Sequence, residues 1–171
     1  QPNHYFSTMK IALTFCCFML CYVSYGQDLL GPIEIEALQE KPHSEWFVAE
    51  YDAYQPYSKT TTQLTPLLKE VAIVVFMGTW CSDSQLQVPA FYNILDAAGY
   101  TKKTTLIAVD TDKKTPSGSA KKHGITHVPT FIFYNAEGVE INRIVESPIE
   151  FLEDDMLQLL SGLDYKHTYE D

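Results

Sequence analysis

A tryptophan and a cysteine, Trp80-Cys81, separate a buried-strand pattern from a helix pattern, and this junction constrains the fold more than any other feature. Residues 71–77 form a nearly continuous apolar run rich in β-branched side chains, which is typical of a central strand buried on both faces. Residues 82–98 place apolar side chains at helical spacing and end at Gly99. A cysteine just after a central strand lies where α/β sheets usually carry functional residues.

The rest of the chain continues this alternation, which predicts an α/β sandwich of three layers, with a central mixed β-sheet flanked by helices. We expect helices over residues 42–54, 62–69, 82–98 and 147–160, and strands over residues 71–77, 105–109, 130–134 and 139–144. The last two strands form a hairpin around a turn that ends in Gly138.

Particular residues predict how these helices begin and pack. Ser44 is the expected cap of the first helix. Ser147 and Glu150 form a capping-box pattern, with Pro148 at the first helical position, so the last helix is expected to begin there. Leu86 is expected to face the core. The residues after Gly162 are expected to be loose.

The segment before the strand pattern indicates export. A positive residue, Lys10, precedes an apolar stretch over residues 11–23 that is too short to span a bilayer comfortably as a helix. Small residues then precede a cleavage position before Gln27, which is the pattern of a secretory signal peptide. After cleavage no stable membrane span is expected, and an uncleaved anchor is the alternative.

These patterns divide the chain into five expected parts: an upstream segment or mis-assigned start (1–8), a signal peptide (9–26), an N-terminal helical extension (27–69), the α/β domain (70–162) and an acidic tail (163–171). The net charge of −10 argues against nucleic acid as a partner. Signal cleavage removes three of the four cysteines and leaves Cys81 alone. A single cysteine in an exported chain indicates intermolecular pairing or a free, reactive thiol.

Residues of about 70 to 162 resemble a thioredoxin-family domain. Trp80-Cys81 matches the family's Trp-Cys-x-x-Cys motif up to its last position, where this chain has Ser84. Pro89 matches the proline in the family's active-site helix. Pro129 matches the proline of the cis-proline loop. The resemblance implies a thioredoxin-like sandwich.

The run over residues 80–84 and the block before the domain also resemble secreted thioredoxin-like proteins of Gram-negative bacteria. This resemblance implies a periplasmic or extracellular location.

The position of Cys81 at a helix start favours its thiolate, because unpaired N–H groups and the positive end of the helix dipole face the sulfur. The carboxylate of Asp83 opposes this effect. The hydroxyl of Ser84 can steady a thiolate but cannot attack a mixed disulfide. An inert buried cysteine and an ordinary helix-start serine are the alternatives.

The expected substrate-binding residues surround this cysteine. Trp80 supplies an apolar wall, and the loop Val128-Pro129-Thr130 offers backbone groups to an extended peptide. His127 either pairs with the thiolate, giving the site a pH dependence near neutrality, or is a solvated loop histidine. No residues have the spacing of zinc or copper ligands, so neither a metal nor another cofactor is expected.

The family's buried aspartate, six residues before the cysteine, is replaced by Val75. Without it and without a second cysteine, the domain is expected to be unable to run a dithiol cycle alone. The predicted function is monothiol exchange by Cys81 with exported proteins or small thiols bearing disulfides, released by an external thiol donor. A redox-inactive peptide-binding module is the alternative. A one-cysteine peroxidase is a third hypothesis, weakened because the only arginine, Arg143, is expected on the far strand.

Overall fold

Five strands form one mixed sheet in the order β1-β3-β2-β4-β5. The computed structural model describes residues 28–170, so the predicted signal peptide lies outside the described residues. The strands are β1 (Gly31–Ile33), β2 (Ala72–Met77), β3 (Thr105–Ala108), β4 (Thr130–Tyr134) and β5 (Glu140–Val145). The helices are α1 (Glu36–Gln39), α2 (Ser44–Ala53), α3 (Ser58–Leu68), α4 (Ser82–Ala97), α5 (Ser119–Lys122) and α6 (Leu152–Leu160).

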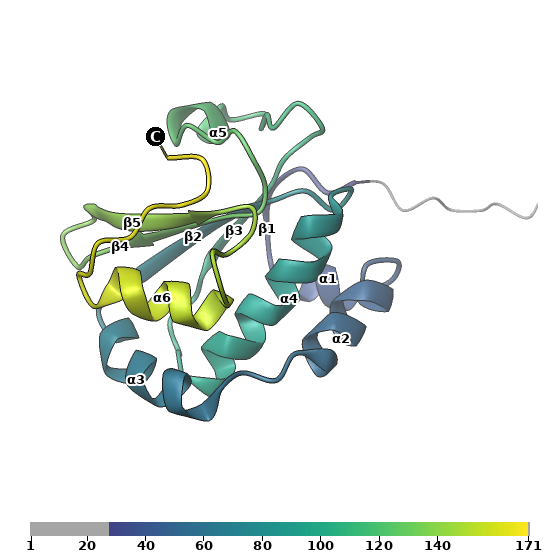
Figure 1. Ribbon diagram of the computed structural model, residues 1–171. Helices are drawn as coiled ribbons and strands as arrows, with labels where there is room; N and C mark the ends of the chain where they lie inside the picture. The colour runs from purple at the N-terminus through teal and green to yellow at the C-terminus, as the bar shows by residue number, and fades with distance from the viewer. Residues whose placement is uncertain (1–27, 171) are drawn as a thin grey trace, which may run out of the picture.

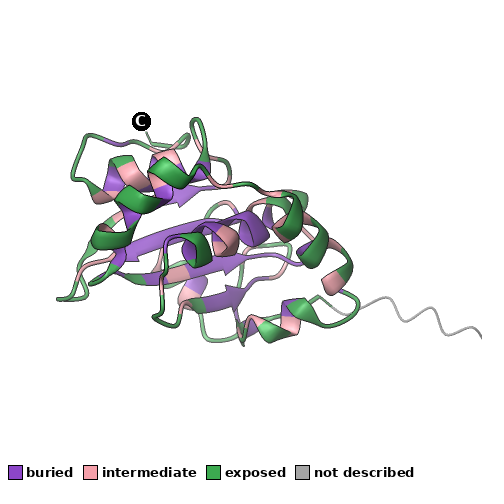
Figure 2. Cartoon of the chain, turned by 90° about the horizontal axis from the view of Figure 1, so that it is seen from below, coloured by how far each residue is buried: buried purple, intermediate pink, exposed green. Residues whose placement is uncertain are grey.

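The central strand β2 pairs in parallel with β3 and antiparallel with β4. Its side chains alternate between two cores, as a strand buried on both faces requires. Val75 belongs to the larger core, which α2, α3, α4 and α6 cover. Phe76 belongs to the smaller core, on the side of α5. Figures 1 and 2 show the resulting layers, with buried strands between helices whose outer faces are exposed. The predicted three-layer α/β architecture is confirmed.

Three elements were not predicted: β1, α1 and α5. The strand β1 pairs antiparallel with β3, so the segment expected to be a helical extension also completes an edge of the sheet. It has only three residues, too few for a periodic pattern to appear in the sequence. The helix α3 begins at Ser58, earlier than expected.

The expected start of the last helix was wrong, because α6 begins at Leu152. The carboxylate of Asp155 accepts hydrogen bonds from the N–H groups of Ile149 (2.7 Å) and Glu150 (3.4 Å), which holds this segment outside the helix. Ser44 is also not a cap, since it is the first residue of α2 and no side-chain cap bond forms there.

Leu86 was wrongly expected in the core and is 50% exposed.

The tail was wrongly expected to be loose. Tyr165 is buried, and its hydroxyl donates to the carboxylate of Asp155 at 2.8 Å. The side-chain amide of Asn142 on β5 donates to the Tyr165 carbonyl at 3.0 Å. The tail therefore packs along the edge of the sheet.

Within residues 28–170, none of the helices has both the length and the apolarity needed to cross a bilayer.

Candidate functional site

Cys81 is the N-cap of α4, at the carboxyl end of β2. Its N–H donates to the Gly78 carbonyl (3.0 Å), and its own carbonyl accepts from the Gln85 N–H (3.0 Å). The Sγ–H donates to the carbonyl of Val128 at 3.2 Å, so the thiol faces the loop that precedes β4. Cys81 is partly exposed and is the one free cysteine in residues 28–170. The predicted placement of the sulfur at a helix start beside this loop is confirmed.

Trp80 covers the strand-to-helix turn. Its indole N–H donates to the Val109 carbonyl at 3.0 Å, and the Lys113 ammonium lies 5.7 Å from the ring centroid. Gly78 lies directly beneath the ring, where an added Cβ would approach Trp80 Cε2 to 2.6 Å. Only glycine leaves room for the indole at this position. The importance of Gly78 was not predicted, although a glycine between a buried strand and a tryptophan is a visible sequence signal.

Ser84 is fully buried, and its Oγ accepts a hydrogen bond from the Gly78 N–H at 3.1 Å. This bond closes the turn that carries Trp80 and Cys81. Ser84, at the position where the family resemblance implies a second cysteine, thus has a direct structural contact with the loop. Its expected influence on the sulfur stays a prediction.

Two residues missed by the sequence analysis also hold this turn. The side-chain amide of Gln85 donates to the Thr79 carbonyl at 2.7 Å. The hydroxyl of Thr79 donates to the carboxylate of Asp28 (3.1 Å) and accepts from the Leu29 N–H (3.1 Å). The segment before β1 is therefore attached to the cysteine loop. No sequence pattern links residues so far apart in the chain.

The opposite wall is the loop before β4, where the Val128–Pro129 peptide bond is cis, as the resemblance implied. Three successive carbonyls of this loop have partners within the chain. His127 O accepts from Thr130 Oγ1 (2.7 Å), and Val128 O accepts from the cysteine thiol. Pro129 O accepts from the Glu146 N–H (2.6 Å). A peptide that pairs with this loop must share these carbonyls or displace a partner.

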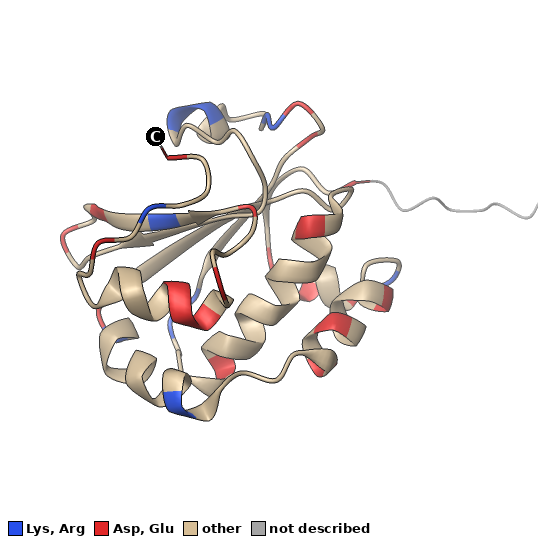
Figure 3. Ribbon diagram, in the orientation of Figure 1, with Lys and Arg blue, Asp and Glu red and all other residues tan. Residues whose placement is uncertain are grey.

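The two candidate modulating residues lie on different sides of the site. Asp83 is in the first turn of α4 and is partly exposed, and Figure 3 shows acidic colour at this end of the helix. His127 does not contact the sulfur in any hydrogen bond of the described residues. Its Nδ1 lies 3.1 Å from Thr126 Oγ1, and its ring stacks on that of Tyr169 from the C-terminal tail. The sequence analysis did not predict this tail contact.

Beneath the site, Val75 is fully buried in β2, at the position where the family resemblance implies an aspartate. It pairs across the sheet with Phe131, and the buried residues of the larger core to which it belongs are apolar. An apolar side chain there offers no proton acceptor.

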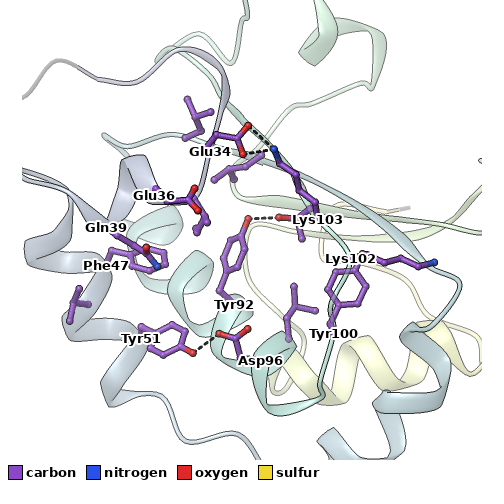
Figure 4. A pocket seen from close by; sticks show the side chains of 16 residues that line it. Glu34, Glu36, Gln39, Phe47, Tyr51, Tyr92, Asp96, Tyr100, Lys102 and Lys103 are labelled. Carbon is purple, nitrogen blue, oxygen red and sulfur yellow. Dashed lines mark hydrogen bonds and ion pairs between the residues drawn. The ribbon is translucent and has the colours of Figure 1, made fainter.

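A cavity of about 670 Å³ lies away from the cysteine, between α2, the second half of α4 and the loop after it (Figure 4). Tyr51 in its wall donates to Asp96 (2.6 Å), and Tyr92 is hydrogen-bonded to Thr104 (2.6 Å). From Cys81 to Tyr92 the chain rises about 16 Å along the helix, at about 1.5 Å per residue. The cavity and the thiol are therefore separate features.

The geometry around the cysteine agrees with a comparison of the sequence with protein families. A family model described as thioredoxin matches residues 36–159. The chain belongs to the thioredoxin family. The match begins in α1 and ends in α6, so it includes both walls of the cysteine site. Among curated proteins, none matches this thioredoxin-family sequence.

Solved structures share the fold at low sequence identity. A protein of unknown function from Pseudomonas aeruginosa is 15% identical, with a TM-score of 0.53, over 70% of this chain and 81% of that one. An HIV epitope-scaffold is also 15% identical, with a TM-score of 0.52, over 71% of this chain and 83% of the scaffold. Thioredoxin O2 from Arabidopsis thaliana in the oxidized state is 23% identical, with a TM-score of 0.41, over 58% and 89% of the two chains. The first two likenesses support the fold alone.

No group of three or more histidine, cysteine, aspartate or glutamate side chains in residues 28–170 is arranged to hold a metal ion.

Proposed function

We propose that this thioredoxin-family protein is an exported monothiol exchange protein, in which Cys81 forms mixed disulfides with exported proteins or small thiols that bear disulfides. The observation that carries the proposal is the position of the Cys81 sulfur. It caps α4, is partly exposed, and lies 3.2 Å from the carbonyl of Val128 in the cis-proline loop. A helix start presents unpaired N–H groups and the positive end of the helix dipole.

The exchange needs no second cysteine. The Cys81 thiolate attacks one sulfur of a substrate disulfide, a bond to Cys81 forms, and the other substrate sulfur leaves as a thiolate that takes up a proton. An external thiolate then attacks the substrate sulfur of the mixed disulfide and restores the Cys81 thiolate. The disulfide has moved to the external thiol without net oxidation of the protein. Ser84 and Val75 support this need for an external thiol. Ser84 cannot attack the mixed disulfide, and Val75 cannot accept the proton of an attacking thiol.

Export is supported by the sequence pattern of residues 9–26 and is tested separately. Mass spectrometry of the protein recovered from the periplasm or medium should give an N-terminus at Gln27. An intact N-terminal segment on protein recovered from the cytoplasm would contradict export.

The exchange is tested by trapping thiols rapidly with acid and separating the protein from its own compartment on a non-reducing gel. Wild type should give higher-mass bands that disappear with reductant, and Cys81→Ala should give none. Ser82→Ala, a matched change at the exposed neighbouring position, should keep the bands. If Cys81→Ala still binds its partners non-covalently and keeps its cellular role, the protein is a redox-inactive binding module instead.

A peroxidase function is not supported by the position of Arg143. Its guanidinium donates to the carboxylate of Glu140 on the same strand, at 2.6 and 2.8 Å, and to the His123 carbonyl at 2.9 Å. The guanidinium N–H groups that would bind a peroxide are therefore already bonded to these partners.

A further inference from the structure

The C-terminal tail, residues 163–170, is anchored at its start and reaches the cysteine site at its end. Tyr165 is 5% exposed and fixes the tail through its bond to Asp155. The side-chain amide of Gln158 on α6 also donates to the Asp164 carbonyl at 2.6 Å. Figure 1 shows the tail leaving α6, passing the β5 edge of the sheet and ending on the side of α5.

The end of the tail lies on the cis-proline loop. The rings of Tyr169 and His127 are stacked, with centroids 3.7 Å apart and an angle of 12° between their planes. The Tyr169 hydroxyl donates to the carboxylate of Glu146. Glu146 in turn donates its N–H to the Pro129 carbonyl at 2.6 Å. One tyrosine thus contacts both the residue before Val128 and the residue that holds the proline.

This contact lies next to the reactive sulfur, because Val128 supplies the carbonyl that accepts from the Cys81 thiol. The hydrogen bond to Glu146 raises the pKa of Tyr169, so the phenol stays protonated and keeps donating to that carboxylate at neutral pH. The tyrosine is thus held on the wall of the site that the cis-proline loop forms.

Glu146, which accepts from the Tyr169 hydroxyl, has an unusual backbone conformation. Its φ is +64°, in the left-handed region that is costly for residues other than glycine. Such residues are concentrated at ligand contacts and switch regions. In this protein the strained residue places its carboxylate on the Tyr169 hydroxyl.

We propose that His127 is the floor of an aromatic subsite beside Cys81, that Tyr169 fills this subsite in cis, and that the preferred substrates are peptide disulfides with an aromatic side chain near the cysteine. This inference rests on the proposed exchange function of Cys81. The incoming aromatic side chain takes the place of Tyr169 on His127, and the tail moves away from the sulfur.

The contacts of the tail are compatible with replacement of Tyr169 by an incoming aromatic side chain. Tyr169 is 44% exposed, and its side chain is held by one ring contact and its hydroxyl bond. Its N–H donates to His167 Nδ1 at 3.2 Å, a contact within the tail itself, so displacement of the ring breaks few interactions with the rest of the protein. The anchor at Tyr165 remains in place and keeps the local concentration of Tyr169 high. An occupied His127 ring in the resting protein and rapid release of Tyr169 for a suitable peptide are both consistent with this arrangement.

The test measures second-order rate constants for Cys81 at pH 7 in the mature protein, compared with Tyr169→Ala and the matched tail control Thr168→Ala. Three probes are used. The first is 4,4′-dithiodipyridine, and the second is the disulfide dimer of a pentapeptide with tyrosine two positions on either side of its cysteine. The third is the alanine counterpart of that dimer. Circular dichroism and thermal unfolding verify that each variant is folded.

Removing the tyrosine ring should raise the rate with the alanine peptide and with 4,4′-dithiodipyridine about 3- to 10-fold, the change expected when one aromatic pair is lost from a closed state. Thr168→Ala should react like wild type. In Tyr169→Ala, the tyrosine peptide should react at least about 3-fold faster than the alanine peptide, and adding His127→Ala should remove this preference.

Two results would overturn the inference while leaving the exchange function in place: equal rates for wild type and Tyr169→Ala, or equal rates for the two peptides in Tyr169→Ala. Failure of the exchange function looks different. In that case every variant reacts with 4,4′-dithiodipyridine, and none forms a mixed disulfide with either peptide.

Discussion

Ser84→Ala distinguishes a structural role for this serine from a chemical one. The Ser84 Oγ is fully buried and accepts from the N–H of Gly78, which is itself buried, at 3.1 Å. Alanine removes the acceptor and leaves that N–H without its partner, at a cost of about 1 to 3 kcal/mol. For a domain of this size, the loss corresponds to a decrease in Tm of roughly 2 to 12 °C.

The assay combines urea unfolding with the rate at which Cys81 reacts with 4,4′-dithiodipyridine, both on protein that was kept reduced. The midpoint should fall in Ser84→Ala while the m-value stays constant, because the folded and unfolded surfaces do not change. Ser84→Cys should lose less stability, since its sulfur remains a weak acceptor for the Gly78 N–H. Unchanged stability together with a changed Cys81 rate would refute the structural role and show that the hydroxyl acts on the sulfur.

Three further changes test other parts of the structure. Gly78→Ala should displace the Trp80 ring and break its bond to the Val109 carbonyl, lowering the free energy of unfolding by about 1 to 3 kcal/mol. In a Trp46→Phe background the fluorescence emission of Trp80 should shift to the red, and an unshifted spectrum would contradict the close approach of Gly78 to the ring. Asp155→Ala should lower the free energy of unfolding in urea by about 2 to 4 kcal/mol, because its buried carboxylate accepts from the N–H groups of Ile149 and Glu150 and from the Tyr165 hydroxyl. A loss no larger than that of Asp154→Ala would contradict this structural role of Asp155. Burial raises the pKa of Tyr92 to about 12, above the unfolded value of about 10, so its contribution to stability is complete below pH 10 and falls by about 2 kcal/mol by pH 12. Tyr92→Phe should reduce the loss of stability between pH 10 and 12 by about this amount, although Tyr51, whose pKa is also raised to about 12, keeps part of the slope. An unchanged slope would contradict the raised pKa of Tyr92.

The central part of the fold could be predicted because its residues are buried by their own local pattern. β2 and β4 are apolar almost throughout, as strands covered on both faces must be. Leu86 failed for a geometric reason. The buried face of α4 contains Ser84 and Val88, and Leu86 lies two residues from each, which is about 200° around the helix at about 100° per residue. Its apolar character alone did not reveal this.

The start of α6 and the packing of the tail could not be predicted, because one residue decides both. Asp155 accepts from the N–H groups of Ile149 and Glu150, which a capping hydroxyl of Ser147 would otherwise have satisfied, and it also binds the buried Tyr165. A polar side chain that joins three segments leaves no periodic signal in any of them. The sequence shows a carboxylate, and only the fold shows its partners.

The candidate site divides in the same way. Cys81, Trp80 and Pro129 could be predicted from a motif and a spacing, because Trp80 and Cys81 follow β2 closely and Pro129 directly precedes β4. The contacts of Thr79, Gln85 and the tail depend on packing between distant segments and carry no such signal.

The proposed monothiol chemistry of Cys81 has a consequence for both steps of the exchange. A dithiol protein resolves its mixed disulfide from within, whereas release from Cys81 requires an external thiol to reach the bound sulfur. If Tyr169 returns to His127 after the substrate has bound, the tail hinders that second attack as well as the first. A substrate whose aromatic side chain stays on His127 keeps the tail away and leaves the sulfur open to the external thiol. The aromatic subsite would then select substrates at capture and favour their release, so the alanine peptide should lag behind the tyrosine peptide in both half-reactions.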